Sequence, residues 1–295
     1  MKTLNIFLSV FIVLLINRIS AAQSIEAEIT KIARDAKGNV GAGIMLAETG
    51  ETAWLKADQH FPMQSVYKLP IAMAILSKVD AGLFSPDSLI LVTKDDFISK
   101  YQHSPIRDEH PEGNFKLKLR DLIRYSVSES DGTASDVLMR MCGGPGEVMK
   151  YLSGLGLRDI HVLNTEKELG HNSSVQYRNY TSPRGAIRLL NLICKGGLFK
   201  PETGKLLLNC MTETSTGLNR IKGLLPKDSK VAHKTGTSGT EKGITAATND
   251  IGIVTLPNGR HLLIAVFVSD SKAPESVREG VIARIAKAGC DKYIK

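Results

Sequence analysis

Segments with the pattern of β-strands lie near both ends of this 295-residue chain, and this feature constrains the fold more than any other. Residues 41–47 and 52–57 form one pair near the N-terminus. Near the C-terminus, the apolar runs 251–256 and 262–268 flank Pro257-Asn258-Gly259, which is a strong hairpin signal. Because a two-stranded hairpin is only marginally stable alone, we expect the two pairs to share a single sheet.

The chain between these strand pairs has the periodicity of helices, from about residue 65 to residue 211. Apolar spacing also predicts a helix that ends near Gly38 and an amphipathic C-terminal helix around Val281. The sequence therefore predicts an α+β fold, in which an antiparallel sheet is flanked by N- and C-terminal helices and carries an inserted all-helical domain. The sheet domain is discontinuous, with residues 23–64 and 212–295, and the helical domain comprises residues 65–211.

The first 22 residues have the order of a secretory signal peptide. Lys2 precedes an apolar run of eleven residues, 6–16, and the small residues Ser20 and Ala22 favour cleavage after Ala22. Because spanning a bilayer takes about 20 apolar residues, a retained membrane anchor is the less favoured alternative. We therefore expect a secreted, periplasmic product without a membrane anchor.

The formal net charge is +8, but the basic residues are scattered through the chain and form no runs. Scattered charge is typical of a solvated surface, so we expect neither a nucleic-acid partner nor a membrane partner. The expected product is a monomer that acts on small molecules.

The cysteines are widely spaced, at Cys142, Cys194, Cys210 and Cys290. In an oxidising compartment they could pair in three ways, and the sequence is equally compatible with one disulfide and with four buried thiols. No CxxC motif is present, and the histidines form no HxxxH or HxH cluster, so we expect no zinc site.

A short motif, Ser65-Val-Tyr-Lys68, opens a run that is apolar on every side as far as Leu76, which predicts a buried helix. Residues three apart share one face of a helix, so the Lys68 amine is expected beside the Ser65 hydroxyl. A serine needs a base to become a nucleophile, and a desolvated lysine beside other cations can have a pKa low enough to act as one. The alternative is a capping serine with an unrelated lysine nearby.

Two further motifs supply groups that an acyl transfer to a ring nitrogen needs. Ser130-Asp-Gly132 offers a hydroxyl that can pass a proton to the departing nitrogen, and Lys234-Thr-Gly236 offers a fixed cation for an anionic substrate. With these three motifs in this order, the chain resembles the class A serine β-lactamases over essentially its whole length after residue 22. The resemblance implies the serine β-lactamase fold, an active site at the interface of the two domains, and no metal or organic cofactor.

The resemblance also implies a second base. Glu166 takes the place of the glutamate that activates water for deacylation, within an omega loop of about residues 164–179. Glu168 is a less favoured rival for the same role on register alone, and a solvated acidic loop is the structural alternative. The implied catalytic residues are therefore Ser65, Lys68, Ser130 and Glu166.

The same resemblance implies a set of substrate-binding residues. They are Lys234, Thr235, Gly236, Thr237, Gly132, Arg220 and His103. The backbone N–H of Thr237 is expected to form the oxyanion hole with that of the nucleophile. Arg220 either supports Lys234 in binding the substrate carboxylate or is a surface arginine, and His103 stands where the family often has an aromatic residue at the cleft mouth.

Four departures from the class A pattern stand out. Gly132 and Gly170 replace asparagines, and Asn164 and Asn179 occupy the positions of an Arg and Asp ion pair, so we expect the omega loop to lack that charge clamp. Asp136 stands where asparagine is more common, and an ionised Asp only accepts hydrogen bonds. Together these changes resemble the branch of class A enzymes associated with cephalosporin hydrolysis, and we expect a roomier site that accepts bulky cephalosporins.

The expected function is hydrolysis of the β-lactam ring of penicillins and cephalosporins through a Ser65 acyl-enzyme, which gives antibiotic resistance. Two alternatives use the same acylation apparatus. One is a D-alanyl-D-alanine peptidase or transpeptidase, and the other is a penicillin-binding sensor that acylates and stops.

Overall fold

The computed structural model describes residues 25–170 and 174–294. The expected signal peptide, residues 1–22, lies outside these residues, so its assignment stays a prediction. Within the described part of the chain, no helix is both long enough and apolar enough to cross a membrane.

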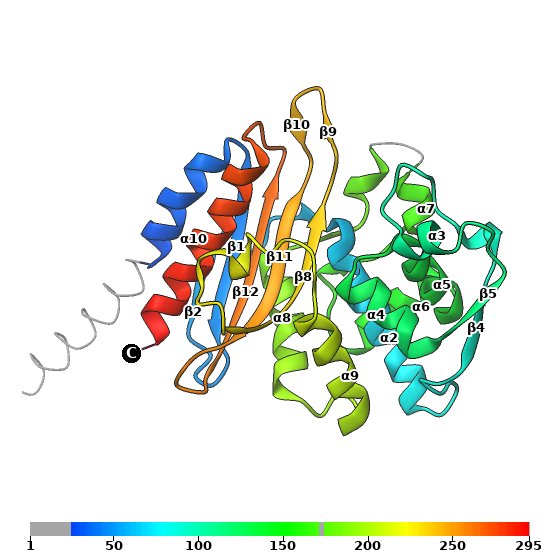
Figure 1. Cartoon of the computed structure of the whole chain (residues 1–295). Coiled ribbons are helices and arrows are strands. Elements are labelled where there is room, and N and C mark those ends of the chain that lie inside the picture. The colour runs from blue at the N-terminus through cyan, green and yellow to red at the C-terminus, as the bar shows by residue number, and fades with distance from the viewer. Residues whose placement is uncertain (1–24, 171–173, 295) are drawn as a thin grey trace, which may run out of the picture.

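A five-stranded antiparallel sheet lies at the centre of one part of the molecule (Figure 1). Strands from both ends of the chain meet in this sheet, because β1 pairs with β12 along its whole length. The expected single sheet is therefore confirmed. In spatial order its strands are β2 (Thr52–Leu55), β1 (Asn39–Leu46), β12 (His261–Ser269), β11 (Thr248–Thr255) and β8 (Lys230–Thr237).

Both faces of this sheet are buried, which explains why its strands read as continuous apolar runs and not as alternating patterns. In β12, Leu263, Ala265 and Phe267 belong to the core shared with the helical part, whereas Leu262 and Ile264 belong to the core under the terminal helices. Successive side chains of a strand point to opposite faces, so one strand contributes to both cores.

The terminal helices cover the outer face of the sheet (Figure 1). They are the helix at residues 25–33, which continues into the 3-10 turn η1 (Arg34–Ala36), and α10 (Glu275–Tyr293). Ile29 and Ile285 are fully buried in the core that these helices share with the sheet. The expected pair of flanking helices is confirmed.

The inner face of the sheet is covered by α8 (Pro183–Lys195), which packs on β1, β11 and β12. The packing is close at Gly43, where a Cβ would lie 2.8 Å from Cγ1 of Ile187. This helix falls within the stretch 65–211 that the sequence assigns to the helical domain. Its amphipathic pattern predicts a buried face but not the partner that buries it, and in the structure that partner is the sheet.

The rest of the chain forms the helical part and short connections. Its helices are α2 (Lys68–Asp80), α3 (Pro105–Glu109), α4 (Leu119–Ser128), α5 (Gly132–Cys142), α6 (Pro145–Gly154), α7 (Glu166–Leu169) and α9 (Pro201–Thr212). Its short strands are β3 (Phe61–Pro62), β4 (Leu89–Val92), β5 (Phe115–Lys118), β6 (Ile160–His161), β7 (Tyr180–Thr181), β9 (Thr240–Glu241) and β10 (Ile244–Thr245). Its 3-10 turns are η2 (Gln64–Tyr67), η3 (Lys94–Asp96), η4 (Val175–Tyr177) and η5 (Ile221–Leu224).

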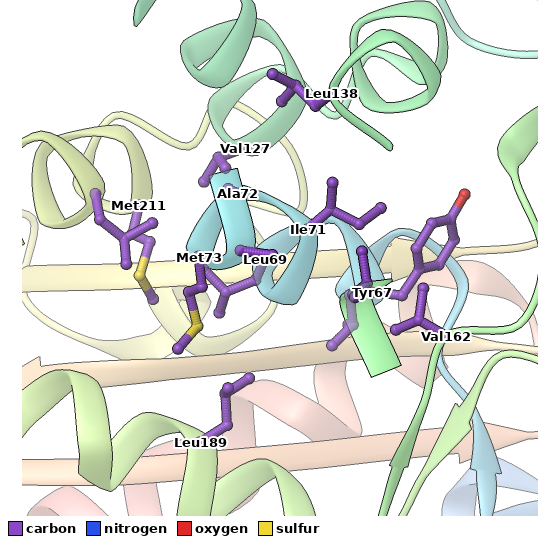
Figure 2. Close-up of a cluster of buried hydrophobic side chains, with 14 of the residues drawn as sticks. Tyr67, Leu69, Ile71, Ala72, Met73, Val127, Leu138, Val162, Leu189 and Met211 are labelled. Atoms are coloured by element: carbon purple, nitrogen blue, oxygen red, sulfur yellow. The ribbon is translucent and has the colours of Figure 1, made fainter. Parts of the chain in front are cut away.

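The helix α2 is the centre of the helical part, and every residue from Lys68 to Leu76 is buried. Figure 2 shows its side chains pointing in different directions, toward Val127 and Leu138 of the helices on one side and toward Leu189 on the other. The expected helix that is buried on every side is confirmed. Because α2 is surrounded, the turn at its N-terminal end, which carries the first motif, is held in a fixed position.

All four cysteines are free thiols. Cys142, Cys210 and Cys290 are buried, and burial raises the pKa of each thiol to about 12. Cys194 is half-buried. Of the two arrangements that the sequence left open, the structure has unpaired thiols. Across the described residues, no three His, Cys, Asp or Glu side chains gather in an arrangement that could hold a metal ion.

Replacing Phe267 with alanine should lower the free energy of unfolding by about 3–5 kcal/mol, because a large buried side chain leaves a cavity. Its ring is fully buried and stacks on Phe61, with the ring centroids 5.8 Å apart. Urea denaturation followed by circular dichroism measures the change. Leu83→Ala is the control, because Leu83 is 66 % exposed. Equal effects of the two substitutions would contradict the shared core described above.

Candidate active site

A cleft of about 480 Å³ is bordered by the edge strand β8 and by the helical part, and the three sequence motifs meet in it. Ser65, Lys68, Ser130, Glu166 and Thr235 all line this cleft. The residues expected to carry the chemistry are thus brought together from four separate segments of the chain.

Ser65 lies in η2, which runs directly into α2. The preceding residue, Gln64, has a φ of +47°, so the chain turns sharply just before the serine. Lys68 is buried at the start of α2, and its Nζ donates a hydrogen bond of 2.6 Å to the backbone oxygen of Ser130. The same Nζ lies 3.4 Å from Oε2 of Glu166. The Lys68 amine therefore links the first motif to Ser130 and to Glu166.

Ser130 links the two buried lysines. Its backbone oxygen accepts from Lys68, and its Oγ accepts a hydrogen bond of 2.9 Å from Nζ of Lys234. Ser130 has a φ of +60°, a left-handed backbone conformation that residues other than glycine rarely adopt. Strain of this kind persists where surrounding contacts enforce it. The two lysine contacts are part of that enforcement, and they hold the hydroxyl in the cleft.

Lys234 is fully buried on β8. Burial lowers the pKa of its amine well below the usual range, and the nearby charge of Lys68 lowers it further. Its Nζ also donates to the backbone oxygen of Thr235, at 3.1 Å. Because a buried charge is costly, an incoming anion would be a favourable partner for this amine.

Glu166 is the first residue of α7, and its side chain reaches toward η2. The Tyr67 hydroxyl donates a short hydrogen bond to Oε2 of Glu166, which is the same oxygen that faces Lys68. Burial raises the pKa of Tyr67 well above its usual value, and the charge of Glu166 raises it further. The phenol therefore stays protonated and can donate to this carboxylate. The carboxylate is thus held by two groups of the first motif.

The strand β8 approaches the turn that carries Ser65 very closely. A Cβ at Gly236 would lie 2.3 Å from the backbone oxygen of Met63, so only glycine fits there. Hydroxyl groups follow on the same strand, where Oγ1 of Thr235 lies 2.5 Å from Oγ1 of Thr216. The close approach places the backbone of this strand beside Ser65, as an oxyanion site requires.

Arg220 is buried behind β8 and is not a surface arginine. Its Nη2 donates to Oγ1 of Thr237 at 2.8 Å, and its Nη1 donates to the backbone oxygen of Asn249 at 3.0 Å. Glu279 neutralises it, with Nε and Oε1 3.1 Å apart. Arg220 thus acts on the cleft through Thr237. His103 is exposed at the cleft mouth, where its Nε2 lies 2.9 Å from the backbone oxygen of Glu129.

A sequence model of the beta-lactamase enzyme family matches residues 24–293 of the chain. Beta-lactamase VEB-1 of Pseudomonas aeruginosa is 36% identical, over 99% of this chain and 98% of its own. Extended-spectrum beta-lactamase PER-1 of the same organism is 37% identical, over 94% of this chain and 90% of its own. The solved structure of a beta-lactamase from Chitinophaga pinensis superimposes with a TM-score of 0.89 at 45% identity, and covers 91% of this chain and 98% of that one.

The chain belongs to the beta-lactamase enzyme family. Its resemblance to the class A enzymes and to their extended-spectrum branch is thereby confirmed. The expected α+β fold is confirmed as well, since the solved β-lactamase structures superimpose on nearly the whole described chain. This β-lactamase therefore acts on β-lactams.

The two glycines that replace asparagines in this β-lactamase lie in crowded positions. A Cβ at Gly132 would lie 2.3 Å from Cδ1 of Ile98 and 2.7 Å from Cγ of Glu166. A Cβ at Gly170 would lie 2.4 Å from Oε1 of Gln102. The roomier site that we expect from all the departures together stays a prediction, but at these two glycines neighbouring side chains occupy the space. Room for a bulky substrate has to come from another wall of the cleft.

The neck of the omega loop is closed by amide groups. The side-chain oxygen of Asn179 accepts from the backbone N–H groups of Leu163 and Asn164, at 2.7 and 2.9 Å, and its Nδ2 donates to the backbone oxygen of Asn164 at 2.9 Å. The backbone oxygen of Asn179 accepts from the N–H of Met63 at 2.8 Å. The loop has a neutral clamp where the family has an ion pair, and that clamp is tied to the segment that carries Ser65.

Glu168, the rival for the deacylating role, has a structural function in the structure. It forms a capping box with Thr165, whose N–H donates to Oε2 of Glu168 at 2.8 Å. Nδ2 of Asn164 donates to the same oxygen at 3.0 Å. The hydrogen bond from Thr165 is the main reason why the pKa of Glu168 is lowered. Glu166, and not Glu168, lines the cleft.

Sequence reasoning missed two residues that contact Glu166. Tyr67 lies inside the first motif, but its pattern predicted only a core residue. Gln102 lies next to His103, and no pattern marked it. The sequence does place Tyr67 between Ser65 and Lys68, at the start of the buried helix, and this could have marked its hydroxyl as a possible donor. The position of Gln102 depends on a loop geometry that the sequence does not reveal.

Asp136 holds the start of α7, because its two oxygens accept from the backbone N–H groups of Glu166 and Lys167, at 2.7 and 2.8 Å. Burial raises the pKa of Asp136 from 3.8 to about 7, against the opposing effect of these two donors. The native carboxyl therefore binds its proton more tightly than the unfolded one. By linkage, this stabilisation is present below about pH 4 and is lost as the pH rises through about 7.

We therefore expect the parent enzyme to lose stability relative to Asp136→Asn as the pH rises. The difference between their free energies of unfolding should fall by about 1.4 kcal/mol per pH unit between pH 5 and 7. It should level off above pH 7. Chemical denaturation at four pH values measures both curves. Asp228→Asn, at an exposed position, should give a curve parallel to the parent. A parallel curve for the Asp136 variant would contradict the raised pKa.

Proposed function

We propose that this β-lactamase opens the lactam ring through a covalent acyl-enzyme on Ser65, and that Glu166 activates the water that releases the product. One observation supports the proposal above others. Nζ of Lys68 lies 3.4 Å from Oε2 of Glu166, in the cleft that Ser65 lines. A nucleophile, an amine and a second carboxylate base thus share one site.

In the acylation step, the Ser65 hydroxyl attacks the lactam carbonyl and gives its proton to Lys68, or through water to Glu166. Lys68 and Glu166 both line the cleft with Ser65, and Nζ of Lys68 contacts Glu166 and the backbone oxygen of Ser130. The C–N bond of the ring then breaks, and Ser130 passes its proton to the departing nitrogen while it receives the proton that Ser65 gave to the base. Lys234, which donates to Oγ of Ser130, stabilises the developing negative charge on that oxygen.

Substrate binding relies on β8. Lys234 and Thr235 are proposed to hold the carboxylate of the substrate, and the backbone N–H of Thr237 is proposed to bind the oxyanion together with that of Ser65. Arg220 orients Thr237 through its hydrogen bond to Oγ1 and adds positive charge behind the strand. Positioned donors in a site shielded from water are each worth roughly 3–4 kcal/mol of transition-state stabilisation.

In the deacylation step, Glu166 takes a proton from water, the water oxygen attacks the ester carbon, and the proton passes to Oγ of Ser65 as the C–Oγ bond breaks. Its Oε2 is held by Tyr67 and Lys68, so the carboxylate is oriented before the water is activated. A D-alanyl-D-alanine peptidase and a penicillin sensor would share the acylation groups. The carboxylate held beside the nucleophile favours complete turnover.

Steady hydrolysis of nitrocefin is the expected result, and a single stoichiometric burst would indicate a sensor or a transpeptidase. Glu166→Ala should slow deacylation by roughly 10²–10⁴-fold, because a general base contributes about that much. Intact-mass spectrometry should then detect a trapped adduct on the enzyme. Glu168→Ala is the matched variant, and it should keep releasing product, although its capping box is lost. Undiminished turnover by Glu166→Ala would remove this residue from the mechanism.

We also propose that cephalosporins are among the preferred substrates. Extended-spectrum beta-lactamase PER-1, a relative at 37% identity, and the departures of this chain from the common class A pattern support this. The cleft has a wall formed by Ser238, Gly239, Thr240 and Glu241, in the hairpin that extends beyond β8 (Figure 1). This open hairpin is the place where a bulky acyl group could fit. Export to the periplasm after removal of residues 1–22 remains part of the proposal.

The value of kcat/KM for an oxyimino-cephalosporin should equal or exceed that for benzylpenicillin. Initial rates across a series of substrate concentrations, measured on one enzyme preparation, provide the comparison. A strong preference for the penicillin would contradict the proposed substrate class while leaving the mechanism intact.

A further inference from the structure

The backbone carbonyl oxygen of Glu166 can accept two hydrogen bonds, and its own loop supplies one of them. The N–H of Glu166 donates to Oδ1 of Asp136, and its carbonyl oxygen accepts from the N–H of Gly170 at 3.2 Å, across one turn of α7. An asparagine at position 136 could accept from the N–H and also donate an amide hydrogen. Here both oxygens of Asp136 are already engaged by the N–H groups of Glu166 and Lys167. Any side-chain donor to this carbonyl must come from elsewhere.

Gln102 supplies that donor. Its Nε2 donates a hydrogen bond of 2.5 Å to the backbone oxygen of Glu166. Its Oε1 accepts from the N–H of Ser99 at 3.2 Å, so both ends of the amide are engaged. The backbone of Gln102 is fixed as well, because its N–H donates to Ser99 at 2.9 Å and its oxygen accepts from Nη1 of Arg107 at 3.0 Å. The side chain is therefore held rigidly against the catalytic loop.

Gln102 and Gly170 are sterically complementary. A Cβ at Gly170 would lie 2.4 Å from Oε1 and 2.7 Å from Cδ of Gln102. A side chain at position 170 and the present side chain of Gln102 therefore exclude each other. The glutamine fills the space beside the loop and places an amide there, at the position where the class A pattern has an asparagine.

We propose that Gln102 is a positioning residue for deacylation, and that it holds the backbone of Glu166 so that the carboxylate faces the acyl-enzyme. The inference rests on the proposed role of Glu166. With Lys68 as the acylation base, it predicts a selective effect, because Gln102 acts on Glu166 and, among the described residues, forms no hydrogen bond with Ser65, Lys68 or Ser130. The deacylation rate depends on Gln102, and the acylation rate does not.

Gln102→Met tests the hydrogen bond directly, because methionine keeps nearly the same length and volume but lacks the donor. Rapid mixing with nitrocefin, followed by acid quenching and intact-mass spectrometry, gives the acylation and deacylation rate constants separately. The deacylation constant should fall about 10- to 100-fold, as expected when a reacting group is misplaced by a small distance. The acylation constant should change less than about threefold, and acyl-enzyme should accumulate. Gln59→Ala, at an exposed position far from the cleft, is the control.

A second pair of variants tests the complementarity. Gly170→Asn alone should impair the enzyme, because the new side chain collides with Gln102. Combined with Gln102→Ala, the same substitution should be less harmful than it is alone, because the space is then free. Thermal unfolding of each variant shows whether it is folded before its rate constants are compared.

Two outcomes would overturn the inference. One is a normal deacylation constant in Gln102→Met, and the other is a loss confined to acylation, which would make Gln102 a substrate contact. Failure of the inference differs from failure of the proposed mechanism. If Glu166→Ala traps the adduct while the Gln102 variants deacylate normally, only the role of Gln102 is wrong. If Glu166→Ala turns over normally, the role of Glu166 itself is wrong.

Discussion

The pairing of β1 with β12 is the constraint on which the rest of the structure depends. It joins both ends of the chain in one sheet, so everything between β2 and β8 must leave the sheet and return to its edge. The returning strand β8 is that edge, and the helical part packs beside it. A cleft therefore forms where the chain re-enters the sheet. The turn that carries Ser65 lies at the other side of this cleft because α2 is buried at the centre of the helical part.

Within the cleft, Ser130 connects groups that would otherwise repel each other. Lys68 and Lys234 are both buried, and their charges oppose one another, which contributes to the lowered pKa of Lys234. Ser130 accepts from one through its backbone and from the other through its hydroxyl. Glu166 supplies the compensating negative charge near Lys68. The strained backbone of Ser130 is thus part of an arrangement in which each polar group has a partner that another segment provides.

The sequence predicted most of the site because its chemistry depends on short, local spacing. Ser65 and Lys68 are one helical turn apart, and the run that follows them is apolar on every side, so both the turn and its burial could be inferred. Arg220 was ambiguous, because nothing local distinguishes a buried arginine from a surface one when its partner is Glu279, far along the chain. The helix α8 was recognisable as a helix, but its contact with the sheet depends on tertiary packing.

The glycines show most clearly where sequence reasoning stopped. At Gly132 and Gly170, the side chains of Ile98, Gln102 and Glu166 occupy the space beside the glycine, and no sequence pattern indicates this. The loop that places Ile98 and Gln102 there has no periodic pattern, so their positions could not be inferred. The contacts of Asp136 were equally hidden, because the residue type indicates an acceptor without indicating which backbone groups it serves.

The amide clamp at the neck of the omega loop has a consequence for the environment in which the enzyme works. Asn164 and Asn179 attract each other as neutral dipoles, and dissolved ions screen such short contacts far less than they screen an exposed pair of opposite charges. The loop is consequently closed equally well in dilute and in saline surroundings. The adjacent start of α7, held by the titratable carboxyl of Asp136, responds instead to acidity. One anchor of the loop is therefore little affected by ionic strength, and the other is affected by pH.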